Sequence, residues 1–511
     1  MDYISFSFPY SSKPGVILIV NVKYGWKLQH SSWRLLTLLI PLQLVAQQLM
    51  STEPKRLARY LIPEKEESCS TYNMLQISSN LFRWTKEVVY ADHYERALTV
   101  GILSIQGGTE PGVMLYMLPL APGNSKAISH HGWGTPFDSF RCCYGTGVES
   151  FSKLGDSIDF EEEGEVPGLY IIQYISSSFT WKSGQILINQ KVDHVVSWDP
   201  HLRVTITFPL DMGEGQLSAL NLRIPTRTHL EGAEAAINDE SLQIPAPGTF
   251  LSITQRWTRD DKLTLRLPIS LRLEKIRPKY ASIQAILYGP YLLVGHTTGD
   301  WNIKNVSADS LSEWITPIPA AYNDHLVTFS QRTRHSDSTS FLINSNHIIT
   351  MGNHSRSGNN SALHSTFRLI LADKSSSKLS TSMDAIGKSV MLEPFDHPGM
   401  LVVYRETDKN HNLQVAKHGH SVFRLVAGLD LRKGTVSLEA ERHKGCFLYG
   451  GVNKHTGERL KLKCNLDKTN HTVIQAASFE MKKGMSKYHP MSFVANGQRE
   501  ISSGVITELQ K

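Results

Sequence analysis

A series of short apolar segments between about residues 165 and 295 constrains the fold most strongly. Segments such as QILINQKV, RVTITFPL and KLTLRLPISLRLEKI alternate apolar and polar residues, and Gly, Pro and Asp turns separate them. A period of two is typical of half-buried β-strands. No segment with helical periodicity stands between them to serve as a parallel crossover, so the pattern predicts an antiparallel β-sandwich.

The segment before these strands has a helical pattern. Apolar residues of the range 70–106 recur every three or four positions, as at Met74, Ile77 and Leu81. This spacing predicts two helices that are interrupted near residues 90–92.

The last third of the chain contains further strand-like segments. Residues 331–392 are rich in Ser, Asn and Thr, which leaves a linker and a second β-layer as alternatives. Beyond them, SVFRLVAGLDLRKGTVSLEA is echoed roughly fifty residues later by ASFEMKKGMSKYHPMSFVA. Repeats of this length built from short strands are typical of a β-trefoil.

Composition limits the classes of protein and partner. A chain of 511 residues with 41% hydrophobic and 20% charged residues is typical of a soluble multidomain protein. The net charge of +6 is small, and no block of consecutive basic residues marks a nucleic-acid-binding tail. We therefore expect no nucleic-acid partner.

Secretion is left open by the sequence. The apolar residues 35–50 resemble the core of a signal peptide, but about thirty residues precede them. The run contains Pro41 and is shorter than the roughly 20 residues of a membrane helix, so no stable membrane span is expected. Sequons that permit N-glycosylation occur at Asn305, Asn353, Asn359 and Asn470.

The five cysteines are unevenly distributed. Cys69 and the adjacent pair Cys142 and Cys143 lie towards the front, and Cys446 and Cys464 lie near the end. The last two are close enough in sequence for one disulfide, or they are two buried thiols. The front three could share a metal site, or they too are buried thiols.

Glu67 stands next to the first of these front cysteines. With Cys69, Cys142 and Cys143 it would complete a tetrahedral set of three thiolates and one carboxylate, which suits Zn²⁺. Spacing alone is weak evidence, because structural zinc sites usually contain two Cys-x-x-Cys pairs.

The residues around these cysteines show a specific resemblance. The stretch EESCSTYNMLQISSNLFRWTKEVVYADHYERALTVGILSIQGGTEPGVMLYMLPL, followed by HHGWGTPFDSFRCCYGTGVESFSKLGDSI, resembles the late catalytic domain of glycoside hydrolase family 127, the β-L-arabinofuranosidases, in its plant form. The similarity continues through YASIQAILYGPYLLVGHT. The final part, with HPGMLVV, FRLVAGLD, GTVSLEA and GCFLYGGVN, resembles an AbfB-type arabinose-binding domain. Together the two resemblances cover roughly residues 53–500.

The resemblance implies a multidomain α+β protein. It would contain a partial (α/α)6-barrel remnant, then antiparallel β-sandwich domains and a C-terminal β-trefoil-like domain. The domains it implies are an unmatched segment 1–52, the end of the catalytic domain 53–160, a middle β-sandwich 161–300, a β-rich extension or linker 301–394, and the arabinose-binding domain 395–511.

The resemblance also implies a retaining glycosidase. Glu67, Cys69, Cys142 and Cys143 would bind Zn²⁺, with Cys142 as the nucleophile. Its substrate would be an arabinose-containing polysaccharide or glycoprotein glycan, and its location the secretory pathway or the cell exterior.

Further candidates lie near the cysteines. Glu95 and Tyr116 fall where the family has further active-site residues, and His130, His131 and Trp133 could bind a sugar through hydrogen bonds and ring stacking. The alternatives are a solvated helix residue at Glu95, a core residue at Tyr116 and a loop cap at the two histidines.

The chain also departs from the family. The general-acid glutamate of the family lies eighteen residues before the first zinc ligand, where this chain has Leu49, and only about fifty unlike residues precede the match. Asp159 stands where relatives have an aromatic residue. The alternative function is therefore a catalytically inactive arabinosyl-binding protein or a truncated fragment. The front part resembles β-L-specific enzymes and the end module α-L-specific ones, so the anomeric preference stays open.

Overall fold

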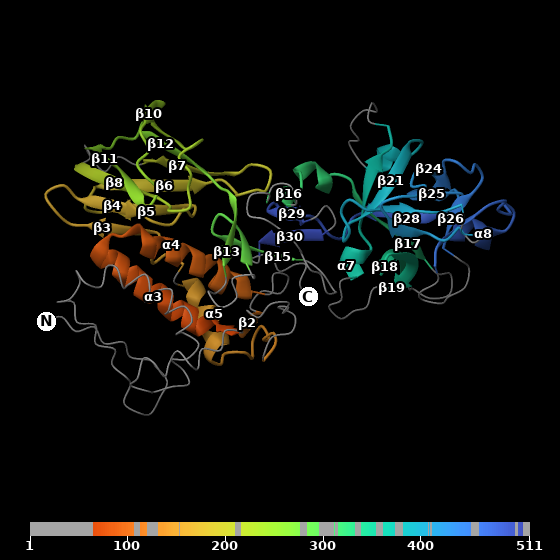
Figure 1. The fold of residues 1–511 in the computed structure, drawn as a ribbon, viewed down its shortest axis with the longest axis horizontal. Helices are drawn as coiled ribbons and strands as arrows, with labels where there is room; N and C mark the ends of the chain where they lie inside the picture. The colour runs from red at the N-terminus through yellow and green to blue at the C-terminus, as the bar shows by residue number, and fades with distance from the viewer. Residues whose placement is uncertain are drawn as a thin grey trace. The chain divides into compact units, whose positions relative to one another are not determined.

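The computed structural model divides the chain into two compact units (Figure 1). Unit 1 comprises residues Met1–Val192 and Arg203–Arg266, and unit 2 comprises Asp193–Leu202 and Leu267–Lys511. The structure describes residues 65–106, 113–119, 131–152, 154–209, 216–275, 284–295, 311, 315–332, 339–353, 361–373, 382–406, 408, 411–450, 459–495 and 499–503. These residues form mostly β-structure with few helices.

The helices of unit 1 lie in the first part of the chain. They are α3 (Ser68–Thr85), α4 (Val88–Arg96) with a π-helical extension Ala97–Ile102 and a 3₁₀ turn Leu103–Ile105, and α5 (Cys142–Ser152). Helix α3 ends where Lys86 takes the left-handed conformation, with φ of 58°. The predicted interruption near 90–92 was therefore wrong, because the break lies before Val88 and residues 90–92 are helical.

Two sheets follow the helices in unit 1. Their strands are β3 (Asp159–Glu162), β4 (Gly168–Ile171), β5 (Ser177–Trp181), β6 (Ile186–Val192), β7 (His201–Thr207), β8 (Leu217–Ile224), β9 (Glu234–Ile237), β10 (Glu240–Leu242), β11 (Thr249–Arg256) and β12 (Lys262–Pro268). The strand orders are β10-β9-β12-β7-β6-β5 and β11-β8-β4-β3. Most neighbouring strands in these sheets are antiparallel as predicted, but β4 and β8 run parallel.

Aromatic side chains connect the parts of unit 1. The rings of Phe208, which follows β7, and Trp257, which follows β11, are stacked with centroids 4.7 Å apart. Phe82 of α3 packs on Phe160 of β3 with centroids 5.0 Å apart, and Tyr90 of α4 joins the same buried cluster. The helices α3 and α4 therefore cover the four-stranded sheet, as Figure 1 shows beneath β3 and β4.

Unit 2 contains two sheet systems. One has the order β13-β14-β15-β30-β29-β16. Its strands are β13 (Leu271–Lys275), β14 (Gln284–Tyr288), β15 (Tyr291–Gly295), β16 (Ile315–Pro317), β29 (Ser492–Ala495) and β30 (Arg499–Ser503). Segments far apart in the chain thus complete a single sheet.

The second system closes on itself. Strands β17 (Leu326–Arg332), β20 (Phe367–Leu371), β21 (Ser389–Pro394), β24 (Phe423–Ala427), β25 (Thr435–Ala440) and β28 (Phe479–Lys483) form a ring, because β28 pairs with both β17 and β25. Three hairpins adjoin it: β18 (Thr339–Ser345) with β19 (Ile348–Asn353), β22 (Leu401–Val403) with β23 (Gln414–Ala416), and β26 (Phe447–Tyr449) with β27 (Lys461–Lys463). Phe367, Phe423 and Phe479, at equal intervals in the sequence, are fully buried in its core.

The structural units differ from two of the predicted domain boundaries. The segment 301–394 supplies β17, β20 and β21, which are half of the ring, so it is not an extension that ends before a separate domain 395–511. Buried residues such as Val327 and Leu392 hold it there despite its polar composition. The boundary at 300 also differs, because β13 to β15 belong to unit 2.

Asp159 occupies an unfavourable position in the sandwich. Its side chain lines a cavity of about 10 Å³ together with apolar residues that include Leu169, Phe179 and Ile188. Burial, and to a lesser degree the charge of Glu161, raises the pKa of Asp159 to about 6. The ionised carboxylate therefore opposes folding at neutral pH.

We predict that Asp159→Asn increases stability at pH 7 and that the gain disappears near pH 4. The folded-state pKa of Asp159 lies above the value of about 3.9 for an unfolded chain, so wild-type stability is lost as pH rises through about 6. Thermal unfolding at both pH values measures this, with the exposed Glu163→Gln as control. A stabilisation of equal size at both pH values would contradict the ionisation argument.

Candidate metal centre and active site

The starts of two helices and a two-stranded sheet bring the front cysteines together. Strand β1 (Lys65–Glu67) pairs with β2 (Met117–Pro119), so that Glu67 lies opposite Met117 immediately before α3 begins. Cys69 lies in the first turn of α3, and Cys142 and Cys143 begin α5. The hydroxyl of Ser68 donates to the carbonyl oxygen of Cys143 at 3.0 Å and so joins the two helix starts.

The three sulfur atoms lie within ligand distance of a common centre. Cys69 Sγ is 3.2 Å from Cys143 Sγ and 3.6 Å from Cys142 Sγ, and the two vicinal sulfurs are 3.8 Å apart. Sulfurs bound tetrahedrally at about 2.3 Å from Zn²⁺ would be separated by about 3.8 Å. The cluster of Cys69, Cys142 and Cys143 could therefore hold a metal ion.

Glu67 fits as a fourth donor. Its Oε2 lies 3.6 Å from Cys69 Sγ. Burial raises the pKa of Glu67, although the hydrogen bond with Cys69 and the charge of His131 act in the opposite direction. A divalent cation at the site would stabilise the ionised carboxylate. Glu67 and the three thiolates would then form an anionic set of ligands.

The thiols differ in acidity and exposure. A hydrogen bond from Cys69 lowers the pKa of Cys143 to about 7, and the same contact with Cys143 raises the pKa of Cys69. The start of α5 also favours negative charge at the vicinal pair. Cys143 is fully buried whereas Cys142 is exposed, so Cys142 is the thiol that a substrate can reach.

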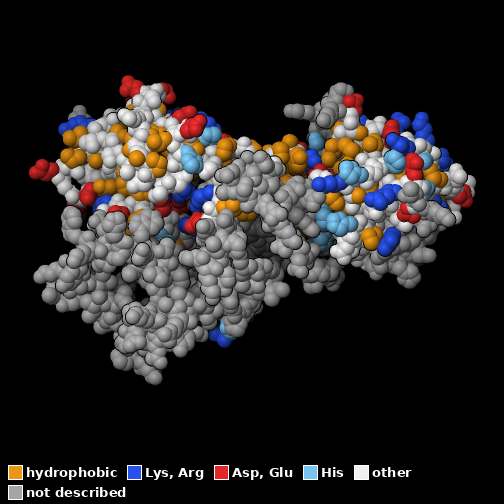
Figure 2. All heavy atoms as spheres, viewed as in Figure 1, with side chains coloured by type: hydrophobic (Ala, Val, Ile, Leu, Met, Phe, Trp, Pro, Cys, Tyr) orange, Lys and Arg blue, Asp and Glu red, His pale blue; other side chains and the backbone are white. Residues whose placement is uncertain are grey.

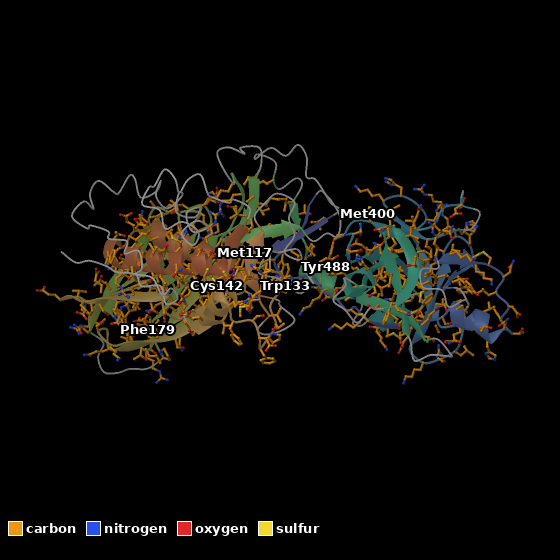
Figure 3. All side chains as sticks on the ribbon, turned by 90° about the horizontal axis from the view of Figure 1, so that it is seen from below. Met117, Trp133, Cys142, Phe179, Met400 and Tyr488 are labelled. Atoms are coloured by element: carbon orange, nitrogen blue, oxygen red, sulfur yellow. A yellow bond between two sulfur atoms is a disulfide. The ribbon has the colours of Figure 1, made fainter. Side chains whose placement is uncertain are left out.

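Aromatic residues stand beside the thiols. The ring of Tyr116 lies 4.8 Å from that of His131 and 5.0 Å from that of Tyr144. Burial, and then a hydrogen bond with Cys142, raises the pKa of Tyr116. Trp133 forms a β-bridge with Leu115 and, like Tyr116, packs against a buried hydrophobic cluster that includes Leu115 and Tyr144. Figure 3 labels Trp133 and Cys142.

The structure thus brings together Glu67, Cys69, Tyr116, His131, Trp133, Cys142 and Cys143 from the predicted set. Tyr116 is half-buried beside the thiols rather than a plain core residue. His130 lies outside the described residues.

Glu95 has a different environment from the one predicted. Its carboxylate oxygens lie 2.6 Å from Arg227 Nη1 and 3.1 Å from Arg223 Nη2. Arg223 is fully buried and also pairs with Asp92. Glu95 therefore binds two guanidinium groups, one on strand β8 and one just after it. The alternative of a solvated helix residue was wrong.

Sequence inspection missed several supporting residues. The hydroxyl of Tyr144 donates to the carbonyl oxygens of His131 and Gly132 at 2.9 and 3.0 Å, which fixes the loop before α5. Gly145 follows at a position where a Cβ atom would lie 2.6 Å from the Phe140 carbonyl oxygen. Nothing in the sequence marked Ser68 or Arg223.

We predict that Glu95→Gln destabilises unit 1 by about 3–5 kcal/mol at pH 7, because it leaves buried guanidinium charge uncompensated. Burial would raise the pKa of Glu95, but Arg223 and Arg227 lower it, so the contribution is present at neutral pH and lost on acidification. Denaturant unfolding measures this loss, with the exposed Glu149→Gln as control. Unchanged stability together with lost catalysis would instead assign Glu95 to the reaction.

Comparisons with solved structures show limited similarity. A GH127 β-L-arabinofuranosidase from Geobacillus stearothermophilus T6 is 18% identical with a TM-score of 0.37, covering 61% of this chain and 44% of that chain. A second GH127 β-arabinofuranosidase is 16% identical with a TM-score of 0.36, covering 68% and 45%. The chain spans less than half the length of these structures. A search of curated proteins found no match.

Two family models match segments in the first part of the chain. Residues 50–156 match the family described as "Beta-L-arabinofuranosidase, GH127 catalytic domain", and residues 168–269 match "Beta-L-arabinofuranosidase, GH127 middle domain". The thiol cluster and Glu67 lie within the first match, and the strands from β4 to β12 coincide with the second. Over these two ranges the chain is similar to the catalytic domain and the middle domain of glycoside hydrolase family 127.

Proposed function

We propose that the chain acts on L-arabinofuranosides through Cys142, in a zinc-thiolate centre formed with Glu67, Cys69 and Cys143. The observation that supports this is the convergence of the three sulfurs within 3.8 Å, in the segment that matches the catalytic domain. Bound zinc would keep the thiols deprotonated at neutral pH.

The thiols and the aromatic residues beside them would have different roles in the proposed reaction. The exposed thiolate of Cys142 attacks the anomeric carbon, while the buried Cys143 and Cys69 hold their positions as metal ligands. Tyr116 and His131, beside the thiols, donate hydrogen bonds to sugar hydroxyls, and Trp133 offers a ring face to the sugar. Water then releases arabinose from the glycosyl-cysteine with net retention.

Departure of a natural leaving group needs a general acid. The family glutamate would align with Leu49, and none of the described residues is assigned this role. An aryl leaving group that is stable as a phenolate departs without protonation, so it tests Cys142 independently of the acid. An aryl substrate therefore tests the role of Cys142 as nucleophile even where the general acid is missing.

We therefore predict that 4-nitrophenyl β-L-arabinofuranoside releases a burst of nitrophenolate and leaves one anhydropentose on Cys142. Intact-protein and peptide mass spectrometry locate the adduct. Cys142→Ser should abolish both, whereas Ser152→Ala, at the exposed end of α5, should retain both. A wild-type chain with bound zinc that forms no adduct and releases no nitrophenolate would refute the enzymatic proposal.

A second candidate function concerns unit 2. We propose that its six-stranded ring with three hairpins is a β-trefoil that binds arabinosyl chains, as the resemblance of residues 395–511 implied. The ring closure of β17, β20, β21, β24, β25 and β28 and the equal spacing of Phe367, Phe423 and Phe479 support the trefoil.

A polar cluster on unit 2 supports ligand binding. Asp396 accepts from Asn344 Nδ2 at 3.0 Å, and its carboxylate oxygens lie 2.6 Å from His364 Nδ1 and 3.2 Å from His397 Nδ1. Burial alone would raise the pKa of Asp396, but the hydrogen bonds with the two histidines hold it below its usual range. Figure 2 shows histidine side chains at the surface of this unit. An ionised carboxylate beside imidazoles is suited to hydroxyl groups of a sugar.

We predict that the full chain binds arabinan and that Asp396→Asn weakens this affinity at least tenfold, because the anionic acceptor is lost. Isothermal titration measures the affinity, with Glu480→Gln on β28 as control. Arabinan binding without release of arabinose or nitrophenolate would favour the alternative of a non-catalytic binding protein. Equal affinity of wild type and Asp396→Asn would exclude this cluster as the binding site.

A further inference from the structure

The segment after Cys464 presents a modifiable side chain to solvent. All of the residues from Asp467 to Thr472 are exposed. Asn470 is the N-cap residue of the short helix α8 (His471–Ala476), which Figure 1 shows at the edge of unit 2. Asn470-His471-Thr472 has the Asn-x-Thr pattern of an N-glycosylation acceptor.

The cap leaves the reactive atom of Asn470 available. Its Oδ1 accepts hydrogen bonds from Thr472 N at 3.1 Å and from Thr472 Oγ1 at 2.5 Å. Both bonds use the oxygen, whereas a glycan is attached to the amide nitrogen, Nδ2. Helix α8 can therefore keep its cap when the side chain carries a sugar.

A disulfide in the same region indicates the compartment. Cys446 and Cys464 are joined, which decides between the two alternatives that the sequence left open for this pair. Disulfides form and persist in oxidising compartments such as the lumen of the endoplasmic reticulum, where N-glycans are also transferred. Cys464 lies only a few residues before Asn470, so one short segment carries both features.

We propose that Asn470 is an N-glycosylation site of this protein. In the transfer, a bond forms between Asn470 Nδ2 and C1 of an oligosaccharide, and the bond from C1 to the diphosphate of its lipid carrier breaks. The amide nitrogen loses one proton, and the lipid diphosphate leaves. This inference is independent of the proposed catalytic function.

Asn353 provides a comparison within the chain. It is exposed at the end of β19, and its Oδ1 accepts from Ser340 Oγ at 2.9 Å across the β18–β19 hairpin. The rest of its sequon lies outside the described residues. Among the described residues, Asn470 to Thr472 is the one complete sequon, and in it the Thr472 hydroxyl is hydrogen-bonded to Asn470.

The test expresses the full chain in cultured eukaryotic cells. The protein is treated with peptide N-glycosidase in ¹⁸O-water, which converts a glycosylated Asn into a mass-labelled Asp, and the Asn470 peptide is analysed. We expect labelled Asp at 470 in the wild type and in Thr472→Ser, which keeps the sequon. We expect no glycan at 470 in Thr472→Val or Asn470→Asp.

Asn470→Asp is the matched control, because Asp caps a helix as well as Asn does but cannot accept a glycan. Its Tm should equal that of wild-type protein made while N-glycosylation is inhibited, in which residue 470 is still an unmodified Asn. Asn353→Asp should leave the label at 470 unchanged. An unlabelled Asn470 peptide from wild-type protein would overturn the proposal, whether or not Cys446 and Cys464 are joined.

Discussion

The meeting of the starts of α3 and α5 is the constraint on which the candidate site depends. The β1–β2 pairing places Glu67 before α3, and the Ser68 hydroxyl bonds the Cys143 carbonyl oxygen. Three thiols so close together are unfavourable as thiolates unless a cation compensates their charge. The same arrangement leaves Cys142 exposed while Cys143 is buried, as the proposed roles of nucleophile and metal ligand require.

The sandwich of unit 1 supports this arrangement through α4 and α3. Phe82 and Tyr90 pack against β3, and the buried Arg223 holds Asp92 and Glu95 of α4. Since α3 packs on α4, the position of Cys69 depends on strands far along the chain. The segment that matches a catalytic domain and most of the segment that matches a middle domain thus share one compact unit.

The sequence predicted the cysteine site through resemblance, because vicinal cysteines some seventy residues from a third have no diagnostic spacing. Alternating residues predicted the strands well, since a half-buried strand needs that pattern. The same pattern did not predict that residues 326–394 form part of the closed ring of strands. In this segment polar Ser, Asn and Thr are more numerous than buried residues such as Phe329 and Phe367. The ion pairs of Glu95 were not predicted, because its partners Arg223 and Arg227 follow more than a hundred residues later.

X-ray absorption at the zinc K edge tests the central claim most directly, because it reports the atoms bound to the metal without requiring turnover. The account predicts one zinc per chain, with three sulfur ligands at about 2.3 Å and one oxygen at about 2.0–2.2 Å. Replacing Cys69 should reduce the sulfur count. Zinc bound only by nitrogen and oxygen, or its absence from the purified protein with free thiols, would contradict the account.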